Sequence, residues 1–412
     1  MDKNAEMAKK VAALVREAGG RTFYVGGFVR DSILGRESKD IDIEIHGITP
    51  KKLAEILNSI GEPIVMGASF GIFGLRGYEL DMAMPRCETA DGRGRKDFED
   101  FVDPFIGTEK AARRRDFTMN ALMQDVLTGE IIDAFGGMED LKRGVIRHVN
   151  DATFAEDPLR VLRAAQFAAR FGFQVADETL AISRRMDLTA LARERIEGEL
   201  QKAFGQAPRP SVFFEELKKM NQLAYWFPAM ESLSREPDAW QRAMRTMDAA
   251  ARMRTEAKYP LGLLYAAACP DGEALVHPVT RETRTIDYVS NMNALRGEIG
   301  RLAAQAGDAD TLSELYDRSV SPEDLILLFR ADRLAAGEDP AQQEGFLRGM
   351  LAEYRRRMAL PFVKGQDLMA AGFEPGPGMG RALKLAHALR LAAVPKEEAL
   401  RKTCALLMKE KK

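Results

Sequence analysis

The spacing of hydrophobic residues over about the first 135 positions switches between helical and strand patterns. Apolar residues between positions 3 and 18 fall on one helical face, and Gly19-Gly20 ends that helix. Residues 40–45 alternate polar and apolar with period two, which is typical of a half-buried strand. In order, the spacing predicts a helix over 3–18, a strand over 22–25, a helix over 28–34, a strand over 40–45, a helix over 51–59 and strands over 71–75 and 79–84.

The pattern changes after residue 140. Strand alternation disappears, and Ala, Leu, Arg, Glu and Met recur with helical spacing to the C-terminus. Breaks over 205–210 and 270–278, and at Leu360-Pro361, divide this helical part. The chain is therefore predicted to be an α+β protein. We expect a small head with a mixed sheet over 1–137, followed by an elongated all-helical neck over 138–207, body over 208–345 and tail over 346–412.

Composition narrows the classes of function. The 412 residues carry 60 Lys and Arg against 62 Asp and Glu, a net charge of −2 that excludes polyanion binding by bulk charge. The cysteines Cys87, Cys269 and Cys404 are too widely spaced for a disulfide framework or a metal site, so no disulfide partner is expected. The N-terminal 20 residues alternate charged and apolar positions, unlike a signal peptide or a membrane span. We expect a cytoplasmic protein.

A glycine turn joins the strand over 22–25 to the next helix. In Gly26-Gly27-Phe28-Val29-Arg30-Asp31, the glycines would let backbone N–H groups approach a phosphate, and Arg30 could pair with phosphate oxygens. An ordinary tight turn is the alternative for such a pair. Gly26, Gly27 and Arg30 are therefore candidate phosphate-binding residues.

Two aspartates follow about ten residues later. On a strand, Asp40 and Asp42 point to the same face while Ile41 points to the other. Two adjacent carboxylates repel each other unless a cation neutralises them, and Mg²⁺ binds carboxylate oxygens together with substrate phosphates. A solvated strand face is the alternative. Asp81, on the alternating segment 79–84, is a candidate third carboxylate, with Glu79 as the competing choice.

These motifs together resemble the head of the class II tRNA nucleotidyltransferase and bacterial poly(A) polymerase family, a group of polymerase-beta-like nucleotidyltransferases. The resemblance covers about residues 20–230 most strongly. The matching segments are Gly26-Gly27-x-Val-Arg-Asp, Leu34-Gly-Arg, Lys39-Asp-Ile-Asp42, Arg114-Arg-Asp-Phe-Thr-Met-Asn-Ala121, Asp133-Ala-Phe-Gly-Gly-Met-Glu-Asp140, Glu156-Asp-Pro-Leu-Arg160 and Arg193-Glu-Arg-Ile-Glu-Gly-Glu-Leu200.

The resemblance implies a nucleotide clamp over 114–121. Planar guanidinium donors on Arg114 and Arg115, beside the Asp116 acceptor, suit triphosphate oxygens and ribose hydroxyls. Asn120 belongs to the same motif and is a further candidate nucleotide-binding residue. A surface ion-pair cluster is the alternative, and burial of the apolar residues of the motif would favour the clamp.

A second implied site recognises the base. Asp157 and Arg160 lie three apart on one predicted helical face, with Arg163 a turn further along. The resemblance implies that this carboxylate and these guanidiniums read the Watson–Crick edge of the incoming nucleotide in place of a template. Asp157-Pro158 is also a good helix start, which would use the carboxylate as a cap. Gln166 departs from the family, where many members carry a third arginine.

Basic residues gather near the C-terminus. Residues 381–412 hold nine Lys or Arg against three Glu, and Arg355-Arg356-Arg357 precede them. Arg355, Arg356, Arg357 and Lys384 are candidate contacts for the RNA backbone. A solvated helix end is the alternative.

The combined prediction is template-independent addition of CCA to tRNA 3′ ends, with CTP and ATP as substrates. Asp40, Asp42 and Asp81 would hold two Mg²⁺ ions, one activating the RNA 3′-hydroxyl and the other stabilising the pyrophosphate. An A-adding enzyme, a CC-adding enzyme and a poly(A) polymerase share these motifs, although a charged loop over 88–112 argues against a CC-only enzyme. A non-catalytic RNA-binding protein is the alternative of a different class, and the intact Asp-x-Asp pair argues against it.

Overall fold

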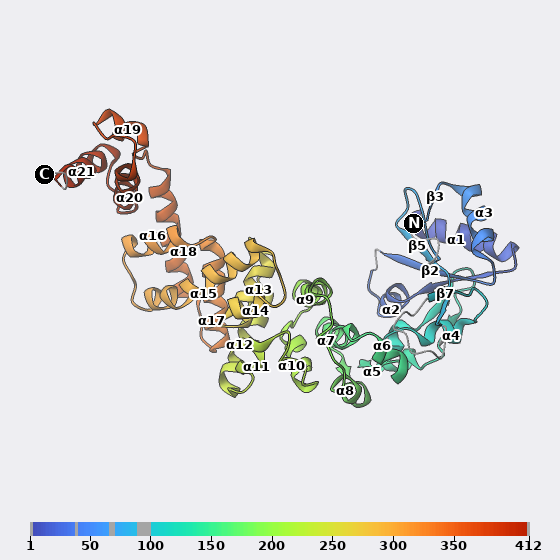
Figure 1. The fold of residues 1–412 in the computed structure, drawn as a ribbon. Helices are drawn as coiled ribbons and strands as arrows, with labels where there is room; N and C mark the ends of the chain where they lie inside the picture. The colour runs from blue at the N-terminus through green and yellow to red at the C-terminus, as the bar shows by residue number, and fades with distance from the viewer. Residues whose placement is uncertain (1–2, 38–39, 66–70, 89–99, 410–412) are drawn as a thin grey trace. The chain divides into compact units, whose positions relative to one another are not determined.

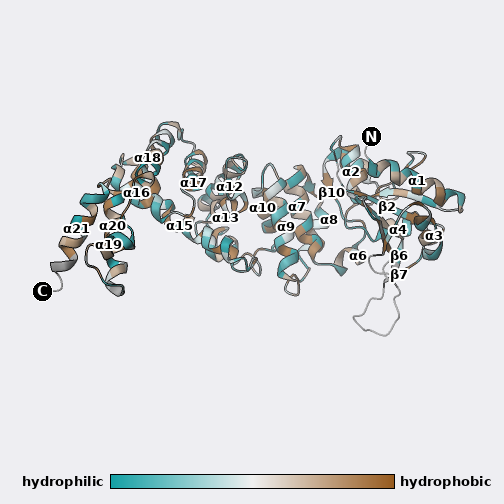
Figure 2. Ribbon diagram, turned by 90° about the horizontal axis from the view of Figure 1, so that it is seen from above, coloured by the Kyte–Doolittle hydropathy of each residue, from teal (hydrophilic) through white to brown (hydrophobic). Residues whose placement is uncertain are grey.

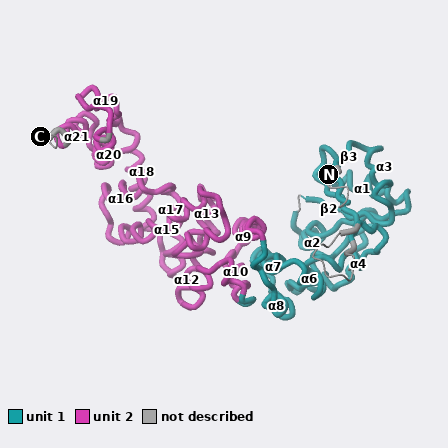
Figure 3. Tube along the Cα trace, in the orientation of Figure 1, with its two compact units in different colours: residues 1–191, 219–221 teal, residues 192–218, 222–412 magenta. Residues whose placement is uncertain are grey.

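The computed structural model describes residues 3–37, 40–65, 71–88 and 100–409. The chain forms two compact units: unit 1 contains residues 1–191 and 219–221, and unit 2 contains residues 192–218 and 222–412 (Figure 3). Every strand of the described residues belongs to unit 1, whereas unit 2 is built from helices (Figure 1). The predicted α+β class is therefore confirmed. The finer division into head, neck, body and tail stays a prediction.

Unit 1 is organised around a mixed sheet. The described strands run in the order β3-β4-β5-β2-β1-β8-β9. β2 and β5 are parallel, while β1 is antiparallel to both of its neighbours, β2 and β8. The bounds are β1 (Arg21–Val25), β2 (Ile41–His46), β3 (Pro63–Val65), β4 (Ile72–Leu75), β5 (Leu80–Ala83), β8 (Met123–Asp125) and β9 (Ile131–Ile132).

The alternation in β2 determines which face of this strand enters the core. Ile41, Ile43 and Ile45 are at most 2% exposed, so the side chains between them lie on the opposite face of the sheet. Helix α1 (Lys3–Glu17) contacts β1, and its apolar stripe is buried as its spacing predicts. The remaining helices of this unit are α2 (Gly27–Ile33), α3 (Pro50–Ile60), α4 (Thr108–Arg113), α5 (Gly137–Arg143), α6 (Asp151–Glu156), α7 (Leu159–Phe171) and α8 (Asp177–Ser183).

Two small strand pairs differ from the sequence-based expectation. β6 (Arg86–Glu88) pairs with β7 (Asp100–Val102), and β10 (Val145–Ile146) pairs with β11 (Gln174–Val175). The expected loop over 88–112 is therefore partly strand and, in α4, partly helix, while residues 89–99 lie outside the described residues. Strands of two or three residues are too short to show a period of two, so hydrophobic spacing does not reveal them.

Unit 2 consists of amphipathic helices. Several of them begin with a proline at the first turn, where the missing N–H costs nothing. Figure 2 shows hydrophilic and hydrophobic positions on several of these helices, as packing of one face requires. They are α9 (Arg193–Gln206), α10 (Ser211–Lys219), α11 (Pro228–Leu233), α12 (Pro237–Ala251), α13 (Pro260–Ala268), α14 (Gly272–Val276), α15 (Thr283–Ala304), α16 (Ala309–Arg318), α17 (Pro322–Ala335), α18 (Ala341–Ala359), α19 (Gly365–Ala370), α20 (Pro377–Leu391) and α21 (Lys396–Lys409).

Candidate active site

The parallel pairing of β2 with β5 places two carboxylates side by side. Asp42 of β2 is in register with Asp81 of β5, and Asp40 lies just before β2 at an exposed position. Burial and the neighbouring charge of Asp81 raise the pKa of Asp42, and Arg115 opposes the shift only in part. A divalent cation at this point would relieve the repulsion. Glu79 precedes β5, whereas Asp81, which is also exposed, lies within β5 directly opposite Asp42.

The donor set fits Mg²⁺ that is held jointly with substrate. In the described part of the chain, no three Asp, Glu, His or Cys side chains converge closely enough to form a metal site alone. Mg²⁺ commonly uses one or two protein carboxylates and completes its shell with substrate phosphates and water. Asp42 and Asp81, with Asp40 nearby, match that arrangement.

The glycine turn lies against an arginine of the 114–121 motif. Gly26 has a φ of +64°, which is the left-handed region that favours glycine. A Cβ built on Gly26 would lie 3.1 Å from Nη1 of Arg115, so the absence of a side chain also makes room for this guanidinium. The turn and the clamp motif, far apart in sequence, are therefore neighbours in the fold.

A pocket of about 260 Å³ opens beside the carboxylates. It is lined by Arg86, Arg114 and Arg115, with Glu44 and Ala83, the residues two positions after Asp42 and Asp81, in its wall. The apolar residues of the 114–121 motif are buried, with Phe117 and Met119 at 0% exposure, as the clamp interpretation requires. Arginine guanidiniums next to a pair of carboxylates provide ligands for triphosphate oxygens and for the cation that accompanies them.

Comparison with known proteins agrees with this geometry. Residues 22–147 match the family model of the poly A polymerase head domain. This segment is similar to that head domain. It contains the glycine turn, the Asp-x-Asp strand and the 114–121 motif. The "Multifunctional CCA protein" of Haemophilus ducreyi is 37% identical over 265 residues, which cover 60% of this chain and 63% of that protein.

A second relative is also similar in sequence, and several solved structures have a similar fold. The "Multifunctional CCA protein" of Nitrosococcus oceani is 42% identical over 215 residues, 51% of each chain. The chain thus spans about half to two thirds of the length of these relatives. The Thermotoga maritima CCA-adding enzyme complexed with tRNA has a TM-score of 0.71 at 22% identity, covering 99% of this chain and 96% of that one. The Bacillus stearothermophilus CCA-adding enzyme in complex with CTP has a TM-score of 0.71 at 24% identity, covering 100% and 98%.

Polar residues of unit 1, most of them buried, form a continuous hydrogen-bonded chain. Arg30 donates through Nε to Asp31 and through Nη1 to Oδ1 of Asn120, at 2.8 and 2.7 Å. Asn120 donates to Asp116 at 2.9 Å, and Arg163 of α7 donates to the other Asp116 oxygen at 2.7 Å. The chain links the glycine-turn helix to α7.

This network changes the expected roles of its members. Arg30 is 4% exposed and its guanidinium also lies over the rings of Phe167 and Phe171, so it is engaged inside the fold, and its direct contact with phosphate stays a prediction. Asp116 is 8% exposed; its Oδ1 accepts from Asn120 and from the Phe117 backbone N–H, and its Oδ2 accepts from Arg163, so the carboxylate is already bonded within the fold. Arg30, Asp116 and Asn120 hold the site together, whereas Arg114 and Arg115 line the pocket.

The candidate base-reading helix has mixed contacts. Oδ1 of Asp157 accepts from the Leu159 backbone N–H at 3.1 Å. This contact is the one expected if Asp157 caps the start of the helix. Arg160 donates to the backbone carbonyls of Thr153 and Arg114, which ties α7 to the clamp motif. Gln166 is 1% exposed and its Nε2 has no hydrogen-bond partner among the described residues. At this position the side chain faces the core instead of the solvent.

Glu44 and His46 lie at the site without having been predicted from the sequence. Glu44 is 7% exposed, and its two oxygens accept from Arg115 at 3.1 Å and meet His46 Nε2 at 2.8 Å. Burial alone would raise the pKa of Glu44, but the His46 hydrogen bond and the Arg115 charge outweigh it and hold the pKa below its usual range. The signal was present in the sequence, since Asp40, Asp42 and Glu44 share one strand face.

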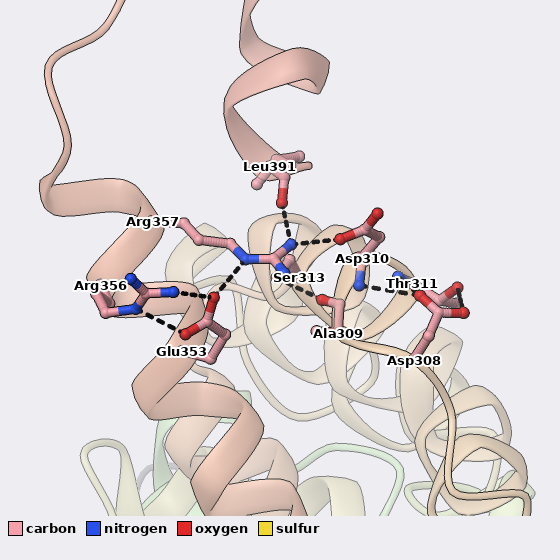
Figure 4. Close-up of polar contacts among 9 residues, drawn as sticks. All are labelled: Asp308, Ala309, Asp310, Thr311, Ser313, Glu353, Arg356, Arg357 and Leu391. Carbon is pink, nitrogen blue, oxygen red and sulfur yellow. Dashed lines mark hydrogen bonds and ion pairs between the residues drawn. The ribbon is translucent and has the colours of Figure 1, made fainter. Parts of the chain in front are cut away.

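The basic residues of unit 2 divide into exposed and buried groups. Lys384 is exposed, whereas Arg357 is 7% exposed and donates to Glu353, Asp310 and the Leu391 carbonyl (Figure 4). Its donors join α18 to α16 and α20, so the structure gives Arg357 a structural role, and its contact with RNA stays a prediction. Hydrogen bonds from Arg356 and Arg357 lower the pKa of Glu353 to about 2. Arg355 and Arg356 are exposed but paired with Glu323 and Glu353.

Other expectations concern cysteines and membranes. Cys269 and Cys404 are free thiols, and the side chain of Cys87 lies outside the described residues. Within the described ranges, no helix is both long enough and apolar enough to cross a bilayer.

Proposed function

We propose that this protein is a template-independent nucleotidyltransferase that adds C, C and A to the 3′ end of tRNA from CTP and ATP. The observation that carries the proposal is the register of Asp42 with Asp81 beside a pocket lined by Arg86, Arg114 and Arg115. The names of the relatives and the CCA-adding enzymes that share the fold support tRNA as the RNA substrate.

The residues divide the work of nucleotidyl transfer. Asp42 and Asp81, with Asp40, would hold two Mg²⁺ ions, which when bound supply charge stabilisation for the attacking and leaving oxygens at the α-phosphate. Arg114 and Arg115 would bind the triphosphate and orient it for in-line attack. The Arg30–Asn120–Asp116–Arg163 chain keeps the clamp motif and α7 in one arrangement.

Base selection is assigned to α7. Asp157 and Arg160 stand at its N-terminal end, and Arg160 is bonded to the backbone of Arg114 in the pocket wall. A nucleotide held by Arg114 would therefore have its base directed toward these side chains. Substitution of Asp157 or Arg160 should change the preference between CTP and ATP.

The deciding assay sizes the products made by pure protein with Mg²⁺. The RNAs are tRNAs lacking CCA, CA or A, and an unrelated RNA, with CTP and ATP supplied separately and together. We expect two additions from CTP, one from ATP after CC, and none on the unrelated RNA. Addition of A alone, of CC alone or of long A tracts would identify the corresponding partial enzyme or a poly(A) polymerase.

The control for metal chemistry is Asp42→Asn. This variant should lose incorporation while it retains tRNA binding in a gel-shift measurement. If the wild-type chain binds tRNA but incorporates nothing under any of these conditions, the protein is a non-catalytic RNA-binding protein and the proposal fails.

A further inference from the structure

Glu44 is an acidic residue whose place in the site differs from that of its neighbours on the strand. It shares a face of β2 with Asp42, but it is 7% exposed, whereas Asp42 is half-buried and Asp40 is exposed. Both of its oxygens are occupied: Oε2 accepts from Nη2 of Arg115 at 3.1 Å, and Oε1 meets His46 Nε2 at 2.8 Å. Each oxygen of Glu44 thus already has a partner within the fold.

The partner of Glu44 is a pocket residue. The Arg115 side chain is 30% exposed and lines the pocket that we assign to the triphosphate. On one side the guanidinium meets Glu44, and on the other its Nη1 lies against Gly26, 3.1 Å from the position of an added Cβ. Two fixed neighbours leave few orientations for a side chain that would otherwise sample many.

Glu44 and the metal-site carboxylate Asp42 both attract the Arg115 guanidinium. The Arg115 charge acts on Asp42 as well as on Glu44. Without Glu44, the guanidinium would still be attracted by Asp42, and an Arg115–Asp42 pair would occupy a carboxylate that the Mg²⁺ ions need. A buried Glu44, braced by His46, keeps Arg115 on the pocket side.

We propose that Glu44 is a positioning residue that orients the Arg115 guanidinium toward the triphosphate of the incoming nucleotide. This inference rests on the proposed function, since it assumes that the pocket takes a nucleoside triphosphate. Glu44 acts through Arg115 and does not touch the substrate.

A double-mutant cycle tests the coupling between the two residues. Glu44→Gln keeps the shape and removes the charge, and it should raise the KM and the Kd for CTP and for ATP roughly tenfold, because charge-assisted hydrogen bonds are the strong ones. The kcat should change less than about threefold, since Asp42 and Asp81 remain. In an Arg115→Ala background, Glu44→Gln should change KM and Kd by less than about twofold.

The control is Asp248→Asn. Asp248 is also a nearly buried carboxylate paired with an arginine, Arg209 at 3.1 Å, but it belongs to unit 2. Its variant should keep wild-type nucleotide KM and Kd. Glu44→Asp provides a second variant that keeps the charge, in case Glu44→Gln does not fold. One methylene shorter, it cannot keep both contacts and should raise KM severalfold.

Three outcomes would overturn the inference. The first is that folded Glu44→Gln or Glu44→Asp keeps the wild-type KM and Kd. The second is that Glu44→Gln changes KM and Kd equally with and without Arg115. The third is that the substitution changes kcat alone. Failure of the proposed function is distinguishable, because Kd for CTP with Mg²⁺ is measured without RNA. A chain that binds nucleotide but incorporates none would still report the coupling in Kd.

Discussion

Asp116 shows how the surroundings of one side chain determine what it can do. Burial by itself raises the pKa of this carboxyl, but the charge of Arg163 and hydrogen bonds from Asn120 and the Phe117 backbone outweigh burial and lower it. The side chain is therefore ionised and fully bonded at neutral pH. From the sequence, Asp116 is a candidate ligand-binding residue. In the fold, its hydrogen bonds stabilise the neighbouring residues that could bind the nucleotide.

Asp116→Asn should destabilise the protein by about 2 kcal/mol at pH 7, because it leaves the partly exposed Arg163 without its anion. The folded pKa is depressed, so the contribution is fully present above the unfolded value of about 3.9 and is lost as the pH falls through the folded pKa. Urea unfolding at pH 7 and at pH 3 should show the difference between wild type and variant shrinking. The exposed Asp177→Asn should stay within about 0.5 kcal/mol of wild type at pH 7. A difference independent of pH would contradict the ionised assignment.

Asp81 and Glu79 provide a matched test at the same strand. Asp81→Asn should lower kcat roughly a thousandfold, about 4 kcal/mol, because Asp81 stands in register with Asp42. Glu79→Gln should remain near wild type, since Glu79 precedes β5 and it is Asp81 that pairs with Asp42. Single-turnover incorporation of CTP measures both. The opposite ranking would move the third carboxylate to Glu79.

At the scale of elements, the connection from β1 to α2 matters because it lies against a side chain of the 114–121 motif. Its glycine at φ +64° turns the chain and leaves space for Arg115, which comes from a motif almost ninety residues later. Helix α7 has a comparable position, because Arg160 and Arg163 bond the clamp motif from the other direction. The site is thus assembled from a turn, two parallel strands and a helix that are distant in sequence.

Gly26→Ala should raise the KM for CTP roughly tenfold, because an added methyl displaces the Arg115 guanidinium. Gly35→Ala is the control, since Gly35 has nearly the same φ of +66° but nothing within 4 Å of an added Cβ. Both variants should lose about 1 kcal/mol of stability from the left-handed backbone. Steady-state kinetics with each nucleotide separates the two. An equal KM for both variants would show that strain, and not crowding, is responsible.

At the scale of the whole molecule, charge is nearly balanced within each unit: unit 1 carries 28 Lys and Arg against 31 Asp and Glu, and unit 2 carries 32 against 31. The charged clusters are therefore local features of each unit. The acidic pair and its arginines lie in unit 1, while the basic C-terminal helices lie in unit 2. Those helices have a small core of their own, with Leu368, Ala382 and Ala399 buried. Arg357 also stabilises this part of unit 2, since its hydrogen bonds join α18 to α16 and to the end of α20. Some of the basic residues therefore stabilise the unit, and only the remainder can meet RNA.

Lys384→Ala and Arg357→Met should separate these two roles. Lys384→Ala should weaken tRNA binding and reduce the slope of log K against log salt by about 1, while stability changes by less than about 0.5 kcal/mol. Arg357→Met should lower the free energy of unfolding by about 2 kcal/mol, because it removes bonds to Glu353, Asp310 and Leu391. Filter binding over a salt series and urea unfolding measure the two effects. An unchanged salt slope for Lys384→Ala would exclude Lys384 from the RNA contact.

The sequence by itself determined the elements with a clear period and the order of the motifs. Period two over 40–45 and helical spacing over 3–18 reflect one buried face, so each segment carries its own signal, and β2 and α1 lie where that signal predicts. Only the tertiary structure decided the register of Asp42 with Asp81, the burial of Arg30 and Asp116, and the pairing of Glu44 with Arg115. These depend on contacts between segments tens of residues apart, and no local pattern contains them. The same residue types can bind a ligand or hold a site together, and burial and hydrogen-bond partners decide which.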